Sequence, residues 1–407
     1  MTIGKTFYII NQYASTPETG RAVRHYNLAK ELAKRGHKVY LIAASYNHLL
    51  LTPPYLKDDY RIDDISGFKF VWIRMPRYAH SHSKIRVLNW FIFAWKILKL
   101  SKIISDKANT ILYSSPSLVP FLGAYLLARK LNSKLVWDIR DLWPLTLVEL
   151  GKISKLHPFI LFHQWLENFA CRKSDFIISN LPIVYNYLLK KGVKKSSFSW
   201  IPNGLSIENF RKKNFLNLKT KKQLPLKKFI IGYAGSLGIS NAPKPLLDAV
   251  LLTRNDKNIH YVLVGNGDLR KIIEEFILNN KLTNITLLNA IPKNEIPSLL
   301  KYFDICYAGF NKSSLYKYGT ALNKLPEYFM SGKPILFSIN SPYKPVNKAK
   351  AGFTVPAEDT KAIVRAIYKL KKMPLIKRKQ LGKNGQNYAI KNFDYVKIAK
   401  NLEKVLI

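Results

Sequence analysis

Short apolar runs and helix-like stretches alternate along the chain, and this alternation constrains the fold more than any other feature of the sequence. The apolar runs at residues 7–10 and 38–42 flank a stretch in which apolar side chains recur at helical spacing. A strand, a helix and a second strand in this order form the repeating unit of a parallel sheet, because parallel strands need a crossover connection. The alternation restarts at residue 229. The sequence therefore predicts an α/β fold with two parallel-sheet domains.

The boundary between the two domains is expected at the turn Ile201-Pro202-Asn203-Gly204. Asn-Gly favours positive φ and a sharp reversal of the chain, and the lysine-rich stretch at residues 211–228 has little to bury. At 407 residues the chain is long enough for two domains. We therefore expect one domain at residues 1–202 and a second at residues 203–386.

Glycines follow several expected strands, at the edge where a parallel sheet binds its ligands. Gly20 follows the first strand, Gly235 follows the strand that begins at residue 229, and Gly265 and Gly267 follow the strand at residues 260–264. Glycine allows the backbone to approach a ligand closely, although a simple turn is the alternative for Gly20. We expect the Gly20 loop to face a cleft between the domains.

Three charged residues cluster at the carboxyl end of the expected strand at residues 134–139. They are Asp138, Arg140 and Asp141. The two carboxylates can hold an acceptor hydroxyl, and the guanidinium can hold a diphosphate. The alternative is a structural ion pair between Arg140 and Asp141. We interpret the three side chains as candidate catalytic residues.

The stretch at residues 318–334 reads as a loop, a helix and a turn. Pro326 suits a first helical turn, so the helix is expected to begin between residues 322 and 325 and to stop at Gly332. Lys324 and Glu327 are three residues apart and project together near a helix start that attracts anions. Lys324 can hold phosphate oxygens and Glu327 can accept hydrogen bonds from two ribose hydroxyls. The alternative is a surface ion pair between them.

Three passages of the chain resemble one family. They are R-D-L-W-P at residues 140–144, I-P-N-G at residues 201–204, and the stretch that holds Lys324 and Glu327. Together they resemble retaining glycosyltransferases with the GT-B fold, of the large group called family 4, and within it the bacterial branch of O-antigen and capsule synthesis. Gly319 stands where most relatives carry the first glutamate of an E-x7-E signature. A glycine at this position also occurs in the branch that resembles the N-acetylfucosamine transferases.

The resemblance implies two Rossmann-like domains that face a cleft, with a last segment, residues 387–407, that packs back on the first domain. It implies transfer of an N-acetylated hexosamine or a deoxyhexose from a UDP donor to a lipid-diphosphate-linked acceptor, with retention of configuration. Lys324 would serve catalysis as well as binding, and Ile291 would pair with uracil through its backbone. The implied donor-binding residues are Gly20, Gly235, Gly265, Gly267, Ile291, Gly319, Thr320, Lys324 and Glu327.

The sequence departs from the family pattern at two further places. Many relatives carry a histidine where Arg140 stands, so the usual candidate base is missing. Relatives also often carry an arginine and a lysine after the strand at residue 229, to hold the donor diphosphate. Neither is clearly in place here, and Lys244 is the candidate for the lysine.

The net charge of +41 at pH 7 predicts an anionic partner: a nucleotide, an anionic lipid surface or a nucleic acid. The segment at residues 85–104 combines tryptophan and phenylalanine with flanking lysines and arginine. Its apolar core is far shorter than the roughly 20 residues that span a bilayer. It is therefore expected either to lie on an anionic membrane surface or to be a core helix with a solvated basic edge.

The two cysteines, Cys171 and Cys306, lack metal-ligand spacing and argue against a disulfide-stapled secreted protein. The apolar run at the N-terminus is too short for a signal sequence. We therefore expect a cytoplasmic protein, peripheral on the inner face of the cell membrane. The oligomeric state stays open.

No D-x-D motif occurs in the sequence. Cationic side chains and helix N-termini would then stabilise the leaving diphosphate, so we expect metal-independent catalysis, no cofactor, and the UDP-sugar as a substrate. One rival is a UDP-sugar epimerase of the same fold, which would need no acceptor. The other is a non-enzymatic nucleic-acid-binding protein, but the basic residues are dispersed and no recognisable nucleic-acid-binding module is present. We expect no nucleic-acid partner.

Overall fold

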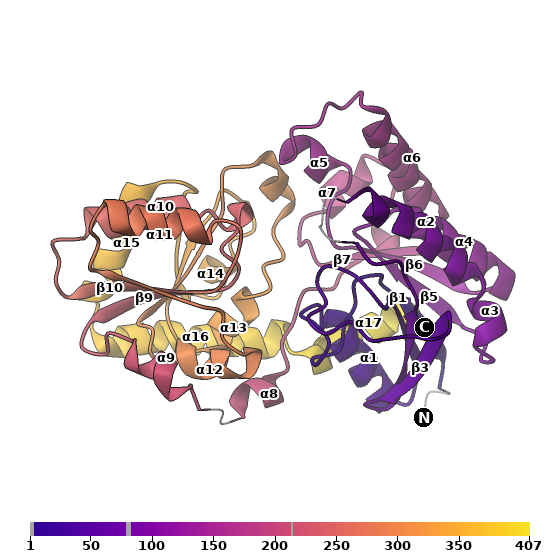
Figure 1. Cartoon of the computed structure of the whole chain (residues 1–407), viewed down its shortest axis with the longest axis horizontal. Helices are drawn as coiled ribbons and strands as arrows, with labels where there is room; N and C mark the ends of the chain where they lie inside the picture. Colours follow the sequence, from indigo (N-terminus) through magenta and orange to yellow (C-terminus); the bar gives the residue numbers. More distant parts are fainter. Residues whose placement is uncertain (1–3, 79–82, 213–214) are drawn as a thin grey trace. The chain divides into compact units, whose positions relative to one another are not determined.

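The computed structural model describes residues 4–78, 83–212 and 215–407. The chain divides into two compact units: unit 1 is Met1–Asn203 with Tyr395–Ile407, and unit 2 is Gly204–Asp394 (Figure 1). Unit 2 is one continuous segment, whereas unit 1 is built from both ends of the chain. The division lies one residue after the boundary expected at residues 202 and 203.

Unit 1 contains, over its described residues, an eight-stranded sheet in the order β3-β4-β2-β1-β5-β6-β7-β8. Neighbouring strands are parallel except β3 and β4, which form an antiparallel pair at one edge. The central strands are almost wholly buried because helices cover both faces. The strands are β1 Thr6–Ile10, β2 Lys38–Ala44, β3 Tyr60–Ile65, β4 Phe68–Ile73, β5 Thr110–Ser114, β6 Lys134–Ile139, β7 Phe176–Ser179 and β8 Phe198–Trp200.

Successive residues of β5 show how the two faces of this sheet are covered. Leu112 packs in the cluster that holds α1 and α17, whereas the ring of the next residue, Tyr113, lies against Phe121 of α4. Helices α2, α4 and α6 lie together on the face of the sheet to which Tyr113 points (Figure 1). The helices of unit 1 are α1 Arg24–Lys34, α2 Lys84–Leu98, α3 Leu100–Ile103, α4 Val119–Leu131, α5 Leu145–Glu149, α6 Pro158–Lys173, α7 Tyr185–Leu189 and α17 Tyr395–Leu406, with a short 3-10 turn, η1, at Lys195–Ser197.

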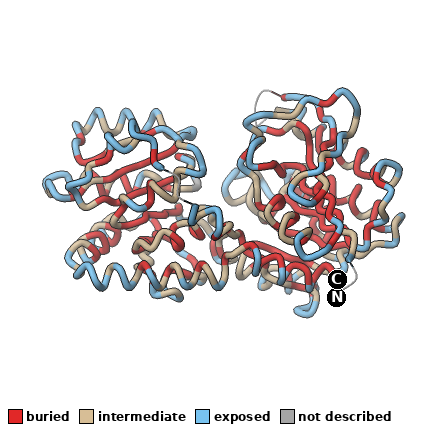
Figure 2. Tube along the Cα trace, turned by 90° about the horizontal axis from the view of Figure 1, so that it is seen from below, coloured by how far each residue is buried: buried red, intermediate tan, exposed pale blue. Residues whose placement is uncertain are grey.

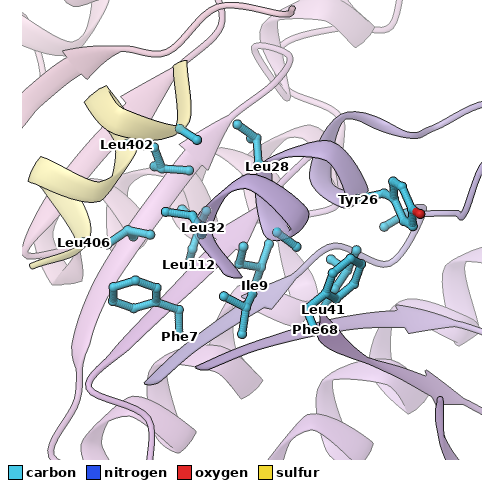
Figure 3. Packing of buried hydrophobic residues seen from close by; sticks show 14 of the residues in the cluster. Phe7, Ile9, Tyr26, Leu28, Leu32, Leu41, Phe68, Leu112, Leu402 and Leu406 are labelled. Carbon is cyan, nitrogen blue, oxygen red and sulfur yellow. The ribbon is translucent and has the colours of Figure 1, made fainter. Parts of the chain in front are cut away.

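The last helix, α17, completes the core of unit 1. Leu402 and Leu406 lie beside Leu32 of α1 and Leu112 of β5 (Figure 3). A polar contact anchors α17 as well, because the buried carboxylate of Glu403 accepts hydrogen bonds from Arg35 and from His37, the latter at 2.8 Å. The segment expected to pack on the first domain, residues 387–407, is divided: its first residues belong to α16 of unit 2 and the rest to unit 1.

Unit 2 contains, over its described residues, a six-stranded parallel sheet in the order β11-β10-β9-β12-β13-β14. Its strands are β9 Phe229–Ala234, β10 Ile259–Val264, β11 Ile285–Leu288, β12 Ile305–Gly309, β13 Ile335–Ser338 and β14 Gly352–Val355. Its helices are α8 Ile207–Arg211, α9 Leu218–Lys222, α10 Pro243–Leu252, α11 Arg270–Asn279, α12 Ile296–Leu300, α13 Leu325–Met330, α14 Pro345–Lys348, α15 Thr360–Lys372 and α16 Leu375–Asn392. Three 3-10 turns are η2 Ile239–Asn241, η3 Lys293–Glu295 and η4 Ser314–Tyr318.

The predicted α/β fold with two parallel-sheet domains is confirmed by the two sheets. In each unit the buried residues concentrate in the central strands, with exposed helices around them (Figure 2). The antiparallel hairpin at residues 60–73 was not predicted. It forms through the turn at Ser66 and Gly67, both with positive φ, and adds an edge strand to an otherwise parallel sheet.

The segment at residues 85–104 forms α2 and α3. One side of α2 is core, because Trp90, Phe93 and Ile97 are buried. Helix α2 lies so close to α4 that a Cβ at Gly123 would stand 2.3 Å from the carbonyl oxygen of Ala94. Among the residues that the structure describes, no helix is long and apolar enough to cross a membrane.

Candidate active site

Lys324 is held at the start of α13 by two partners from other parts of unit 2. Its Nζ donates to the hydroxyl of Tyr233 at 2.6 Å and to Oδ1 of Asn241 at 3.1 Å. The ammonium also stands 3.9 Å from the centre of the Tyr233 ring, a cation–π distance. Tyr233 is the last but one residue of β9 and Asn241 is the last residue of η2, so the end of β9, the loop after it and the start of α13 meet at this nitrogen.

Gly235 makes room for this amine. A Cβ at Gly235 would stand 2.7 Å from Nζ of Lys324, and the φ of Gly235 is +155°. Any other residue would push Lys324 out of its position and strain the backbone. The glycine is thus explained by the side chain that it faces.

The environment of Lys324 lowers its pKa. Burial lowers the pKa to about 7, and Lys293 adds to the effect, while the carboxylate of Glu327 opposes it. Near neutral pH, Lys324 therefore exchanges readily between ammonium and amine. An anionic ligand beside it would favour the ammonium.

Glu327 pairs with Lys293 rather than with Lys324. The ion pair brings η3, and with it the loop that holds Ile291, against α13. The alternative interpretation of Lys324 and Glu327 as a surface ion pair is wrong, because each side chain has another partner. The predicted helix start is confirmed at Leu325, with Lys324 as the N-cap residue.

Glycines after β10 allow two loops of unit 2 to touch backbone to backbone. A Cβ at Gly265 would stand 1.8 Å from the carbonyl oxygen of Gly235, and one at Gly267 would stand 2.6 Å from that of Leu237. Arg270 stabilises the loop after β10, because its Nη1 donates to the carbonyl oxygen of Gly265 at 2.9 Å. Sequence reasoning missed Arg270. The packing of the loops explains both glycines without a ligand.

Gly319 and Thr320 lie between η4 and α13, four to five residues before Lys324. Gly319 ends η4 with φ +86°, a value that favours glycine. Gly20 lies in unit 1, in the loop between β1 and α1, where its amide donates to the carbonyl of Thr16 at 3.1 Å. The structure thus brings the other predicted donor residues into one unit and places Gly20 in the other.

Asp138 lies at the centre of a buried polar cluster in unit 1. Its Oδ2 accepts from Nη1 of Arg24 at 2.7 Å and from the hydroxyl of Ser114 at 2.9 Å, and Nε2 of His25 stands 3.5 Å away. Arg24 also donates to the carbonyl of Ile201 at 2.9 Å. The cluster joins the start of α1 to the ends of β5, β6 and β8.

The charges of this cluster follow from its burial. Burial alone would raise the pKa of Asp138, but Arg24, His25 and Arg140 outweigh it and hold the pKa well below its usual value. Burial lowers the pKa of His25 to about 4, so the imidazole is neutral at pH 7. Sequence reasoning missed Arg24, His25 and Ser114, which lie 114, 113 and 24 residues from Asp138 in the chain.

Arg140 has guanidinium donors that the protein does not use. Among the described residues, its Nε and Nη1 are shielded from solvent and have no hydrogen-bond partner. Burial, with the charge of Arg24, lowers its pKa to about 10, so it remains a cation at pH 7. With Asp138 ionised and His25 neutral, the two arginines leave this cluster with one excess positive charge. It can take an anion.

Asp141 points to a different set of partners. Its Oδ1 accepts from the hydroxyl of Thr146 at 2.7 Å and from the amide of Leu142 at 2.9 Å. Burial raises its pKa. The alternative of a structural ion pair between Arg140 and Asp141 is therefore wrong.

Each unit matches a known glycosyltransferase family over most of its length. Residues 20–209 match the family described as Glycosyltransferase Family 4. Residues 214–388 match the family described as Glycosyl transferases group 1. The comparison with curated proteins found no match.

Solved structures similar to the whole chain share its fold at low sequence identity. A sucrose-phosphate synthase from Thermosynechococcus elongatus is 16% identical, with a TM-score of 0.74 and 98% of both chains covered. Anabaena HepE in complex with UDP and glucose is 15% identical, with a TM-score of 0.68 and 99% of both chains covered. A trehalose-6-phosphate structure from E. coli bound with UDP-2-fluoro glucose is 12% identical, with a TM-score of 0.73 and 99% of both chains covered.

Proposed function

Since the chain is a glycosyltransferase with the GT-B fold, we propose that it moves a sugar from a UDP donor to a lipid-diphosphate-linked acceptor in the synthesis of a surface polysaccharide. The observation that carries the donor half is the position of Lys324, a cation held by Tyr233 and Asn241 beside glycine-rich loops. The acceptor half is carried by Arg140, whose buried Nε and Nη1 have no hydrogen-bond partner among the described residues.

The donor is held in unit 2. Lys324 binds the diphosphate, Glu327 exchanges Lys293 for the ribose hydroxyls, and the backbone at Ile291 pairs with uracil. Anabaena HepE with UDP and the E. coli structure with UDP-2-fluoro glucose support UDP as the donor nucleotide. Gly319 and Thr320 lie next to the sugar.

In the reaction, the hydroxyl oxygen of the acceptor forms a bond to the anomeric carbon of the sugar as the bond from that carbon to the diphosphate oxygen breaks, and the hydroxyl proton passes to the leaving diphosphate. Lys324 stabilises the charge that develops on the leaving UDP. Arg140 binds the acceptor diphosphate, and Asp138 and Asp141 flank it in the sequence. Retention of configuration and independence from metal remain predictions of the family resemblance and of the missing D-x-D motif.

The sugar is proposed to be an N-acetylated hexosamine or a deoxyhexose, and the product an O-antigen or capsule polysaccharide. This part of the proposal depends on the R-D-L-W-P passage and on Gly319. The sugars named in the similar structures are glucose and 2-fluoro glucose, so they do not bear on an N-acetylated donor. The enzyme is proposed to work on the cytoplasmic side of the membrane that holds its acceptor.

Calorimetric titration with UDP, ADP and GDP, first without metal and then with magnesium, tests the donor half. We expect selective UDP binding that magnesium does not change, and a loss of at least about tenfold in affinity in Lys324→Ala and in Glu327→Ala. Lys361→Ala, an exposed lysine of the same unit, is the matched control. Equal, weak binding of all three nucleotides would overturn the assignment of the donor.

A second experiment tests the transfer itself. Protein is incubated with UDP-N-acetylglucosamine, with and without a lipid-diphosphate-linked saccharide, and the products are separated by chromatography. Release of UDP that requires the acceptor supports transfer. An epimerised UDP-sugar without acceptor would instead favour the epimerase.

A further inference from the structure

Helices α2, α4 and α6 of unit 1 present large apolar side chains to solvent. Trp95 is 54% exposed, Phe91 48% and Trp165 49%. The three helices lie side by side: α2 packs on α4, α4 packs on α6, and the ring of Trp90 on α2 stands 6.3 Å from that of Phe159 on α6 (Figure 1). We call this surface the α2/α6 face; its exposed apolar residues are Ile85, Leu88, Phe91, Trp95, Leu126, Leu161, Phe162 and Trp165.

These exposed side chains are not part of the hydrophobic core of unit 1. The opposite sides of the same helices already supply buried residues to the sheet, among them Phe93 of α2, Phe121 of α4 and Leu166 of α6. On α6 the rings of Phe162 and Trp165 stack with each other at 6.2 Å. Exposed aromatic and aliphatic side chains that gather on neighbouring helices of a folded unit mark an interaction surface.

The charges around the α2/α6 face have one sign. Helices α2, α3, α4 and α6 contain a single carboxylate, Glu167, and it is buried and paired with Lys191 at 2.7 Å. Lys99 places its ammonium 3.4 Å above the ring of Trp95. The exposed cations of these helices are Lys84, Lys102, Arg129, Lys130, Arg172 and Lys173.

We infer that the α2/α6 face docks unit 1 on an anionic lipid bilayer, with its aromatic side chains at the level of the headgroups. Aromatic rings partition into the membrane interface, and lysines and arginines around them meet anionic headgroups. The inference rests on the proposed function, because a lipid-linked acceptor would be reached from this surface. The sequence had suggested only residues 85–104 as a membrane-surface segment. The inferred docking surface also includes α4 and α6.

Charge favours a bilayer over a second copy of the chain. In a two-fold dimer through this face, each copy would bring its own lysines and arginines against those of its partner, and the four helices offer no exposed carboxylate to neutralise them. Anionic headgroups neutralise the same cations. The bilayer is therefore the occupant that matches both the apolar centre and the basic edge.

Flotation of the full-length protein with vesicles tests the inference. Vesicles of phosphatidylcholine alone are compared with vesicles that contain phosphatidylglycerol, at low and high salt. We expect binding to the anionic vesicles that weakens with salt, and a loss of at least about tenfold in the double variant Phe91→Ser/Trp165→Ser. The matched control is Leu252→Ser/Leu278→Ser, which removes exposed apolar side chains from unit 2.

A second pair of variants tests the basic edge. Lys84→Ser/Lys102→Ser should weaken binding to anionic vesicles by about tenfold or more, while Lys361→Ser/Lys372→Ser on α15 of unit 2 should not. UDP titration of every variant accompanies these measurements. Unchanged UDP affinity together with lost flotation supports the inference, and lost UDP affinity with normal flotation counts against the proposed function alone.

Two outcomes would overturn the inference. One is wild-type binding to anionic vesicles that Phe91→Ser/Trp165→Ser leaves unchanged. The other is a wild-type dimer in sedimentation velocity that becomes monomeric in the same variant and that does not float with vesicles. Circular dichroism confirms in each case that the variant is folded.

Discussion

At the scale of single residues, the partners of Lys324 decide what it can do. Its pKa is lowered to about 7 mainly by burial, so the side chain is an ammonium at pH 6 and mostly an amine at pH 8. A bound diphosphate favours the ammonium. We therefore expect the affinity for UDP-glucose to fall as the pH rises from 6 to 8, approaching roughly tenfold per pH unit above 7.

Calorimetry across this pH range measures the effect, and UDP-glucose is used because its diphosphate has no free terminal phosphate to titrate. Lys324→Met is the control, since it should bind weakly with no such pH dependence. A wild-type affinity that stays constant from pH 6 to 8 would contradict a role for the ammonium in binding the donor.

Tyr233 is predicted to position Lys324. Tyr233→Phe keeps the ring below the ammonium but removes the hydroxyl that accepts from Nζ at 2.6 Å. The same hydroxyl also donates to the carbonyl oxygen of Ser236. We expect UDP to bind about threefold to tenfold more weakly, the effect of losing the hydrogen bond to Nζ. Tyr302→Phe in the same unit serves as the matched control. If Tyr233→Phe lowers the melting temperature but leaves the UDP affinity and its pH dependence unchanged, Tyr233 is only structural.

Arg140 and Arg24 differ in their partners and should differ in their effects on stability. Arg24→Met leaves Asp138 buried without its main partner, so we expect the free energy of unfolding to fall by about 3 kcal/mol. Arg140→Met removes a buried cation whose Nε and Nη1 have no hydrogen-bond partner in the part of the chain that the structure describes, so stability should stay the same or rise by about 1 kcal/mol. Chemical denaturation measures both.

The same Arg140→Met variant should lose binding of an anion on the acceptor side. Pyrophosphate is titrated into protein already saturated with UDP, so that the donor site is occupied. We expect the wild type to bind and Arg140→Met to bind at least about tenfold more weakly. Destabilisation by Arg140→Met, with no change in pyrophosphate binding, would make Arg140 a structural residue instead.

At the scale of elements, α17 is a structural part of unit 1 although it lies at the other end of the chain. Leu402 is fully buried between α1 and the sheet. Leu402→Ala should lower the free energy of unfolding by about 2–5 kcal/mol, through lost burial and the cavity that remains. Val396→Ala on the same helix is the control, because Val396 is exposed. Equal effects of the two substitutions in chemical denaturation would mean that α17 is not docked as described.

Elements were easier to predict than the contacts between them. The central strands of both sheets and the start of α13 follow from apolar runs and from Pro326, which are local signals, whereas the β3–β4 hairpin was not predicted. The partners of Asp138 and Lys324 are not local: Arg24 and Tyr233 are 114 and 91 residues away in the chain. Which distant side chains meet depends on the packing of whole elements, and a single sequence carries no local signal for it.

Charged residues that are close in the sequence do not form the ion pairs that their spacing suggests. Arg140 and Asp141 are adjacent in the bend that follows β6, yet their side chains have different surroundings. Lys324 and Glu327 lie at helical spacing, yet partners from η2, β9 and η3 separate them. The spacing of charged residues in the sequence predicted which segments contribute to the site. The tertiary structure determines which charged side chains contact each other.

At the scale of the whole molecule, the order of the chain predicts which part can fold alone. Unit 2 is the continuous segment Gly204–Asp394, with its own sheet and core, and it holds every predicted donor residue except Gly20. Unit 1 needs both ends of the chain, because α17 supplies six residues to its core cluster, from Tyr395 to Leu406. The two units therefore differ in what a truncation removes.

We expect residues 204–394, expressed alone, to fold cooperatively and to bind UDP within about tenfold of the full-length affinity. Residues 4–203 without α17 should not give a cooperative unfolding transition, because the apolar surfaces of α1 and β5 would be left uncovered. Circular dichroism during thermal unfolding and UDP titration measure both fragments. A folded unit 2 that has lost UDP binding would show that Gly20 or another residue of unit 1 contributes to the donor site, and a full-length Gly20→Ala variant would then separate the two.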